Sequence, residues 1–257
     1  MKWIIQTNMG NSDSLIDACA SVGVDYKPIT VIPFSSDIPK VKGGDVIFYG
    51  AVNFINSVWE FNRQAKRWTP GVLFSDNFDF KKWRDRYKEE CLNFAAEITT
   101  LGELEKRGYD DESLLFIRPT DDLKAFAGQV IQWKDYKAWL TEIDYGIPEF
   151  KKTEILVGEP FGIKTEWRLF VVDGKVSSGS KYRTYHRLDQ DSFVPSGVIK
   201  YAERIAQIWT PAPIFSLDIA ECGDKYYVNE IGCFHSSGFY YSDIEQIVCD
   251  VTNYLRA

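Results

Sequence analysis

Histidine and cysteine are scarce in this sequence of 257 residues. It contains two histidines and five cysteines, and no two cysteines have the C-x-x-C spacing of a zinc site. A structural zinc site needs four ligands in paired spacing, and an odd number of cysteines argues against a disulfide framework. We therefore expect reduced thiols and no multi-histidine metal chemistry.

A long apolar run and a secretory signal are also missing. The densest apolar stretch, VIFYGAVNFI, runs from Val46 to Ile55 and includes the polar Asn53. A membrane-spanning helix needs about 20 apolar residues. The N-terminal MKWIIQTNMG turns polar after Ile5, unlike the longer apolar core of a signal peptide. These features exclude a membrane span and predict a cytoplasmic location.

Excess positive charge is absent too. The 30 lysines and arginines are outnumbered by 37 acids, so the formal net charge is −7. Proteins that bind nucleic acid without sequence preference usually carry the opposite sign, so a nucleic-acid substrate is not indicated, although a local basic patch could still act. Aromatic residues are plentiful, with 8 Trp, 17 Phe and 14 Tyr, which excludes a disordered chain.

The first 75 residues alternate short apolar segments with helical patterns. Expected strands are Lys2–Gln6, Ile29–Ile32, Val46–Phe48 and Val72–Phe74, and expected helices are Asn11–Val22 and Ala51–Trp68. This rhythm predicts a small parallel sheet with helices packed on it. The segment lacks both G-x-G-x-x-G and G-x-x-x-x-G-K-[ST], so neither a Rossmann nor a P-loop nucleotide site is supported.

The remainder mixes helices with extended segments. Helices are expected over Leu101–Arg107, Ser196–Trp209 and Asp243–Leu255, and strands over Leu114–Ile117, Glu154–Val157, Lys164–Val172, Lys175–Ser180, Ile214–Ala220 and Lys225–Ile231. Five cations between positions 81 and 88 alternate with Trp83 and Tyr87. That pattern is typical of an amphipathic helix with solvated charges. Stacking of the aromatic rings on nucleic-acid bases is the alternative.

Two acids in the C-terminal hairpin SLDIAECGDKYYVNEIG give the strongest functional signal. Asp218 and Glu230 lie 12 positions apart on two strands joined by a tight turn, in otherwise apolar surroundings. A buried carboxylate needs a positive partner, and Mg²⁺ typically binds one or two carboxylates together with substrate phosphates. A magnesium site is one interpretation. The other is that one acid faces solvent while its neighbour pairs with a lysine.

A second segment, LLFIRPTDDLKAFAG, concentrates positive charge beside an apolar strand. Arg118 ends the strand and Lys124 follows in a loop. The arginine could bind phosphate through its planar fork and the lysine as a point charge. Ion pairs with Asp121 or Asp122 are the alternative.

The segment TEILVGEPFGIKTEWRLF has the composition of a nucleotide-binding site. Residues Glu154–Gly158 combine an acid with apolar side chains that could line an adenine. Glu166 could accept hydrogen bonds from ribose hydroxyls, and Arg168 occupies a strand position where an unpaired cation would be costly. Further along, positive charge gathers in a way that suits either an anion site or a solvated hairpin edge, at Lys181, Arg183, His186 and Arg187.

Together these segments resemble the ATP-grasp superfamily. The motifs FIRP, EWRLFVVDGKV, GSKY and NEIGCFHSSGFY occur in the family's order and are similar to a divergent phage and bacterial clade, over roughly residues 76–255. The resemblance implies an α/β (α+β) ATP-grasp fold. Residues 1–75 would form a small βαβ pre-ATP-grasp domain, and residues 76–150 and 151–257 would form two subdomains that clasp the nucleotide, the second with the metal site.

The resemblance also implies a role for each candidate residue. Arg118 would replace the usual first phosphate-binding lysine, with Lys124 nearby. The adenine would be lined by Glu154, Leu156 and Val157, and the ribose would be held by Glu166. Arg168 and Lys181 would face the γ-phosphate or an acyl-phosphate, and Asp218 and Glu230 would hold Mg²⁺.

One position departs from the family's pattern. Many ATP-grasp enzymes have a metal-binding asparagine two residues after the second acid, where this chain has Gly232. Asn229 directly precedes Glu230, but on a regular strand its side chain would point to the opposite face. The expected site therefore has two protein ligands, and a second metal ion is in question.

The implied activity is that of an ADP-forming ligase that joins a carboxylate to an amine through an acyl-phosphate, with ATP and Mg²⁺ as cofactors. Its substrates would be small molecules or peptides, and nothing in the sequence specifies an oligomeric state. Two alternatives stay open. One is an ATP-grasp-type kinase that phosphorylates a hydroxyl. The other is a non-catalytic nucleic-acid-interacting protein with a vestigial nucleotide pocket, acting through residues 81–88 and 181–187.

Overall fold

Two compact units make up the part of the chain that the structure describes. The structure is a computed structural model, and it describes residues 1–32, 46–62, 76–120, 125–143 and 147–256. Unit 1 combines Met1–Phe78 with Ile163–Ala257, and unit 2 comprises Asp79–Gly162. The first and last segments of the chain therefore share one unit. The division into residues 1–75, 76–150 and 151–257 stays a prediction.

A three-stranded parallel sheet forms one part of unit 1. Its strands are β1 (Lys2–Gln6), β2 (Asp25–Ile29) and β3 (Val46–Tyr49), in the order β2-β1-β3. Helix α1 (Ser12–Ser21) connects β1 to β2, and α2 (Val52–Asn62) follows β3. The expected βαβ arrangement is thus confirmed.

One strand of this sheet lies earlier than expected. Gly23, with φ of +69°, turns the chain after α1, and pairing with β1 begins at Asp25. The strand therefore ends at Ile29, and Ile32 lies beyond it as an exposed residue. The expected strand Val72–Phe74 and the end of the expected helix Ala51–Trp68 lie outside the described residues.

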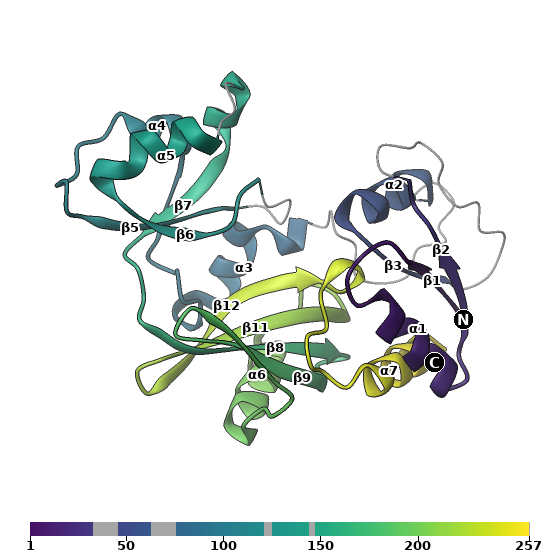
Figure 1. Cartoon of the computed structure of the whole chain (residues 1–257). Coiled ribbons are helices and arrows are strands. Elements are labelled where there is room, and N and C mark those ends of the chain that lie inside the picture. The colour runs from purple at the N-terminus through teal and green to yellow at the C-terminus, as the bar shows by residue number, and fades with distance from the viewer. Residues whose placement is uncertain (33–45, 63–75, 121–124, 144–146, 257) are drawn as a thin grey trace. The chain divides into compact units, whose positions relative to one another are not determined.

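A five-stranded antiparallel sheet forms the other part of unit 1. It has the order β10-β9-β8-β11-β12, with β8 (Ile163–Val172), β9 (Lys175–Thr184), β10 (Arg187–Asp191), β11 (Ile214–Cys222) and β12 (Lys225–Cys233). Two tight turns connect the strands of two long hairpins, β8 with β9 and β11 with β12. Asp173, Gly174 and Gly223 have positive φ in these turns, which lie where the sequence predicts them. Helices α6 (Ser196–Ile208) and α7 (Ile244–Arg256) complete the unit (Figure 1).

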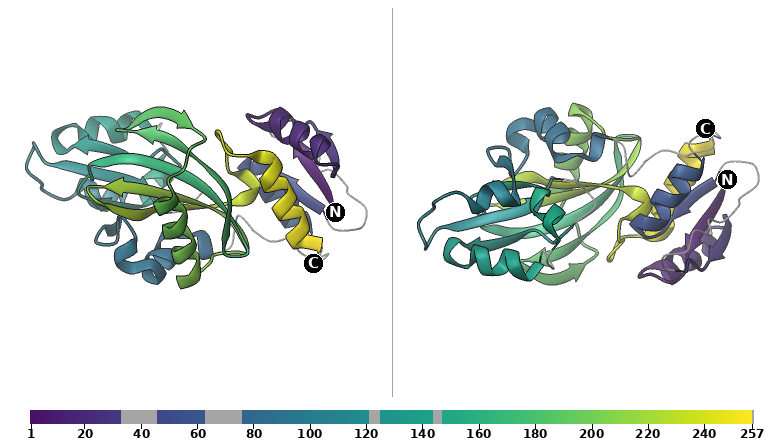
Figure 2. Two further views of the ribbon diagram at one scale, coloured as in Figure 1. Left: turned by 90° about the horizontal axis from the view of Figure 1, so that it is seen from below. Right: turned by 90° about the horizontal axis from the view of Figure 1, so that it is seen from above.

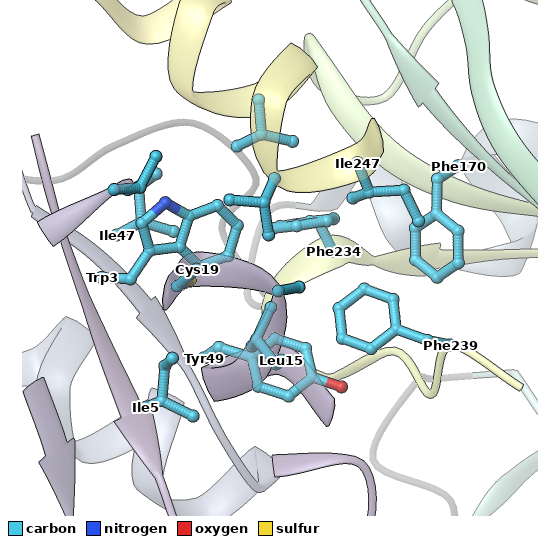
Figure 3. Packing of buried hydrophobic residues seen from close by; sticks show 14 of the residues in the cluster. Trp3, Ile5, Leu15, Cys19, Ile47, Tyr49, Phe170, Phe234, Phe239 and Ile247 are labelled. Carbon is cyan, nitrogen blue, oxygen red and sulfur yellow. The ribbon is translucent and has the colours of Figure 1, made fainter. Parts of the chain in front are cut away.

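The core of unit 1 joins the two ends of the chain. Figure 3 shows Trp3 and Tyr49 of the parallel sheet packed with Phe170 of β8 and with Phe234 and Phe239 after β12. The Trp3 indole donates a hydrogen bond to Thr252 Oγ1 of α7 at 3.0 Å. Consequently the two ends of the chain lie close together in every view (Figures 1 and 2), and α7 packs against α1.

Unit 2 is built on a four-stranded antiparallel sheet. Its order is β4-β7-β5-β6, with β4 (Glu97–Thr100), β5 (Leu114–Pro119), β6 (Gln129–Gln132) and β7 (Glu154–Gly158). Helices α4 (Leu101–Glu105) and α5 (Tyr136–Ile143) pack on one face, against Ile117, Ile155 and Val157. Short 3-10 turns complete the chain at Asp76–Phe78 and Phe234–Ser236 in unit 1, and at Lys88–Glu90, Trp133–Asp135 and Pro148–Lys152 in unit 2.

The basic segment of unit 2 is the amphipathic helix α3 (Phe80–Tyr87). Asp79 caps it by accepting a hydrogen bond from the Lys81 amide at 2.8 Å. Trp83 and Tyr87 are buried on its inner face, with Phe80. The three rings are therefore covered by the protein and are not free to stack on bases.

The length and composition of the helices decide whether one of them can cross a bilayer. Within residues 1–32, 46–62, 76–120, 125–143 and 147–256, none of them combines the length and the apolar character needed to cross a bilayer.

Candidate functional site

Asp218 of β11 and Glu230 of β12 are direct cross-strand partners in unit 1. Opposed residues of an antiparallel pair project to the same face of a sheet, with Cβ atoms about 5 Å apart. On the other side of β11, the pairing with β8 places Asp218 opposite Arg168. The sheet therefore brings these three side chains, predicted from sequence, onto one face.

Asp218 is held by Arg168 in a bidentate pair. Arg168 Nε and Nη2 donate to Asp218 Oδ1 and Oδ2, each at 2.8 Å. The two side chains are 13% and 4% exposed. Burial opposes the charge on Arg168, but the neighbouring Asp218 carboxylate raises the arginine's pKa well above its ordinary value. The positive partner that a buried acid requires is thus an arginine rather than a lysine.

Tyr182 of β9 connects this pair to Glu166. Its hydroxyl donates to Glu166 Oε2 at 2.9 Å and lies 3.3 Å from Asp218 Oδ2. Burial, and then the charges of Asp218 and Glu166, raise the pKa of Tyr182 well above its ordinary value, so the phenol stays protonated and acts as a donor. Its ring stacks on Tyr240 at 5.0 Å, and the Arg168 guanidinium lies 5.1 Å from the Tyr240 ring.

Glu166 is almost fully buried and accepts several hydrogen bonds. Besides Tyr182, it accepts from Asn229 Nδ2 at 2.9 Å and from Arg183 Nη1 at 3.3 Å. Two acids, two arginines and one tyrosine therefore form a connected polar network on this face, with Asn229 at its margin. The ribose contact expected of Glu166 stays a prediction, and three protein donors already occupy this carboxylate.

The orientation expected for Asn229 is wrong. The β11–β12 register passes from Asp218 opposite Glu230 to Ile219 opposite Val228, so Asn229 is the extra residue of a β-bulge. A bulge breaks the alternation of side chains along the strand. Asn229 consequently reaches Glu166, which shares the face of Asp218, instead of pointing to the opposite face.

Gly232 has little space for a side chain. A Cβ atom at this position would lie 2.7 Å from Ser216 Oγ. Ser216 in turn shares a hydrogen bond of 2.8 Å with Ser237. The two hydroxyls occupy the volume into which an asparagine at position 232 would project.

Lys181 does not join the network. It lies opposite Trp167 in the β8–β9 register, and alternation places both side chains on the face away from Arg168. Its ammonium pairs instead with Asp189 of β10 at 2.8 Å. The phosphate role expected of Lys181 stays a prediction, and the structure does not bring this residue together with Arg168.

In unit 2, the candidate residues gather beside α3. The Arg118 guanidinium lies 5.3 Å from the Phe80 ring and 5.7 Å from the Trp83 ring. Glu154 accepts a hydrogen bond from Thr120 at 2.9 Å and forms an ion pair with Lys81 at 2.8 Å. That hydrogen bond with Lys81 lowers the pKa of Glu154 below its ordinary value.

The two apolar adenine candidates point in opposite directions from β7. Leu156 lies opposite Arg118 in the β5–β7 register and so shares its face of the sheet. Val157 packs on the other face, in the core beneath α4 and α5. Only its backbone could contact a nucleotide. Lys124 lies outside the described residues.

The acids of unit 1 fit a magnesium ion chemically. Carboxylate oxygens are the ligands that Mg²⁺ prefers, and one or two carboxylates suffice when phosphates complete its coordination. Asp218 and Glu230 offer such a pair on one face. Over the residues described, no group of three or more His, Cys, Asp or Glu side chains gathers, so the donor set is the two-acid kind.

Comparison with solved structures places this fold among ATP-grasp proteins. D-alanine–D-alanine ligase from Bacillus anthracis has a TM-score of 0.63 at 12% identity, covering 99% of this chain and 98% of that chain. A RimK domain ATP-grasp protein from Sphaerobacter thermophilus has 0.62 at 13%, covering 100% of both. The ATP-grasp ligase PsnB, complexed with minimal precursor, Mg and ADP, has 0.59 at 12%, covering 99% and 96%.

The sequence family agrees with the fold. The model of the ATP-grasp domain, R2K clade family 3, matches residues 55–251, and the chain belongs to this family. The superfamily and the mixed α and β architecture expected from the motifs are thereby confirmed. No curated protein matches the chain in sequence.

Sequence reasoning assigned no role to Tyr182, which belongs to the network, or to Tyr240, whose ring stacks on it. Tyr182 ends the motif GSKY and Tyr240 ends NEIGCFHSSGFY, but neither motif assigned these tyrosines a contact. That membership in two motifs of the resemblance was the available signal. A bulge opposite Glu166 brings both Tyr182 and Arg183 to that acid, and no pattern in the sequence marks it.

Proposed function

We propose that this protein is an ATP-dependent, ADP-forming ligase that joins a carboxylate to an amine. Membership of the ATP-grasp family and the likeness of its fold to solved ligases support the class. The observation that carries the proposal is the pairing of Asp218 with Glu230 on one face, with the buried cation Arg168 beside them.

The proposed ligase reaction has two steps, phosphoryl transfer and amide formation. A substrate carboxylate oxygen attacks the γ-phosphorus of ATP, the bond from that phosphorus to the β–γ bridging oxygen breaks, and ADP leaves. The acyl-phosphate then reacts with an amine. A C–N bond forms, the bond between the acyl carbon and the phosphate oxygen breaks, and the amine loses a proton as inorganic phosphate leaves.

The chain's residues position and neutralise charge in this reaction. Asp218 and Glu230 would hold Mg²⁺, which supplies charge neutralisation at the phosphates. Arg168 is permanently charged and buried, so it would stabilise negative charge on the transferred phosphoryl group more effectively than a solvated cation could. Tyr182 stays protonated and fixes both acids of the network through its hydroxyl.

The substrates follow from the class rather than from an identified pocket. PsnB is solved with a precursor peptide, and D-alanine–D-alanine ligase is named for an amino acid. We therefore propose small-molecule or peptide carboxylates and amines as substrates. A nucleic-acid role has less support, because Trp83 and Tyr87 are buried and Lys181 and Arg183 are paired with acids.

The test is ADP release from Mg·ATP across a library of carboxylates and amines, with hydroxylamine as a trap. An acyl-phosphate yields a hydroxamate, whereas the phosphorylated alcohol of a kinase does not. Glu230→Gln should reduce ADP formation about 100-fold or more, because it removes one of the two acids expected to hold the metal.

The matched control is Glu221→Gln, on the neighbouring strand β11. Glu221 pairs with Lys164 at 2.9 Å rather than with the polar network, so this variant should retain most activity. ADP formation without hydroxamate would favour the kinase. Equal activity in Glu230→Gln and the wild type would contradict the metal assignment.

A further inference from the structure

The two roles expected of Asp218 and Arg168 compete with each other. A carboxylate that ligates a metal must present its oxygens to the cation, and an arginine that contacts phosphate must present its donors to that anion. Here both Asp218 oxygens accept from Arg168, and two donors of the guanidinium face Asp218. In this pair, Arg168 occupies the Asp218 oxygens that a metal ion would need. Asp218 in turn occupies guanidinium donors that a phosphate would need.

We propose that Arg168 is an internal competitor of the divalent cation. Arg168 and the cation bind the same Asp218 carboxylate, and the arriving cation displaces the guanidinium fork, which then becomes available to the phosphoryl group. This inference rests on the proposed function for the fate of Arg168, whereas the competition itself concerns only Asp218 and a cation.

The geometry supports displacement rather than simple addition. A bidentate arginine takes two of the roughly four acceptor sites of a carboxylate. The Tyr182 hydroxyl lies 3.3 Å from Oδ2 and takes up part of the remainder. A cation that binds both oxygens therefore needs the position that the fork holds.

The surroundings offer the displaced guanidinium other contacts. The Tyr240 and Tyr182 rings lie 5.1 and 5.8 Å from it, and Gly238 O lies 3.5 Å from Nη1. Ring faces attract a cation without forming a fixed bond. Arg168 can thus leave Asp218 without losing all its partners, because the aromatic pair stays beside it.

The test measures cation binding without any nucleotide. Mn²⁺ is the probe, and electron paramagnetic resonance measures its free concentration during titration of the wild type, Arg168→Gln and Asp218→Asn. Arg168→Gln removes the guanidinium that competes for the Asp218 carboxylate. This variant should therefore bind Mn²⁺ about tenfold more tightly, or more. Asp218→Asn should weaken it.

Two further variants separate the fork from general charge. Arg183→Gln removes an equal charge on the same face, but from the partner of Glu166, so it should tighten binding much less than Arg168→Gln. Arg168→Lys keeps the charge but offers a point contact in place of the fork. It should bind Mn²⁺ more tightly than the wild type, and it serves if Arg168→Gln does not fold.

The outcomes are separable from those of the ligase proposal. If Arg168→Lys and Arg168→Gln bind Mn²⁺ no more tightly than Arg183→Gln and the wild type, the competition is refuted, whatever the ADP assay gives. If they bind it more tightly but the protein forms no ADP, the competition stands and the ligase proposal falls. Thermal midpoints in Mg²⁺ and in chelator give a second measure, since a ligand that binds more tightly stabilises more.

Discussion

The Arg168–Asp218 pair of unit 1 and the Lys81–Glu154 pair of unit 2 have the same shortest distance, 2.8 Å, but different surroundings. The first is 13% and 4% exposed, and the second is 47% and 41% exposed. Solvent screens the exposed pair and hydrates either partner alone. Water cannot replace either partner of the buried pair in this way. Burial, rather than distance, therefore decides what each pair contributes.

This difference has a functional side. Glu154 can exchange Lys81 for water or for a ligand at little cost, because both groups already contact solvent. Asp218 can give up Arg168 only to another cation, since an uncompensated buried carboxylate is strongly unfavourable. We therefore expect buried Asp218, unlike exposed Glu154, to accept only positively charged partners.

The largest expected effect comes from breaking the buried pair. Asp218→Asn leaves the Arg168 charge buried without its carboxylate, and should lower the free energy of unfolding by about 3–5 kcal/mol. Urea unfolding followed by circular dichroism measures the loss. The double variant Arg168→Met/Asp218→Asn should recover a large part of it. Additive losses in the double variant would mean that the pair is not coupled.

A smaller effect should come from the hydroxyl that links the pair to Glu166. Tyr182→Phe removes a donor from a buried carboxylate, which should cost about 1–3 kcal/mol of unfolding free energy. The ring, and so the stack with Tyr240, is retained. Tyr240→Phe is the matched control from the other side of the stack and should cost less. Equal losses in the two variants would argue against a special role for the Tyr182 hydroxyl.

The smallest effect is expected for the exposed pair. A double-mutant cycle with Lys81→Met and Glu154→Gln should give a coupling energy of about 0.2–1 kcal/mol, because solvent screens the charges. A coupling above that of the Arg168–Asp218 cycle would overturn the comparison between the two units.

The coupling energy of the exposed Lys81–Glu154 pair should also decrease at low pH and at high pH. The hydrogen bond with Lys81 lowers the pKa of Glu154 below 4.5, so the contribution is present above pH 4.5 and is lost as the pH falls through the lowered value. The same bond raises the pKa of Lys81 above 10.5, so the contribution persists below pH 10.5 and is lost as the pH rises through the raised value. Repeating the cycle at pH 3, at pH 7 and above pH 11 measures both limits.

Local pattern predicted the fold well where an element is defined by neighbours in sequence. The tight turns at Asp173-Gly174 and Gly223-Asp224 indicated two hairpins, and both formed with long strands on either side. The strand β10 was not predicted, because its sequence RLDQD is polar and all five residues are exposed. An edge strand of that kind is held by pairing with β9 rather than by burial, so it has no apolar periodicity to detect.

The sequence alone determined that Asp218 and Glu230 lie on neighbouring strands, because a tight turn defines one hairpin. It did not determine their direct pairing. A regular register beyond the turn would oppose Asp218 to Asn229, and the bulge shifts the partner to Glu230. Tertiary structure alone decided that Arg168 neutralises Asp218, that Tyr182 joins it to Glu166, and that Asn229 turns to the same face. Those contacts depend on bulges and on β8 and β11 pairing across 50 positions of sequence between Arg168 and Asp218. Registers of that kind are set by packing the whole sheet, and local propensity carries no information about them.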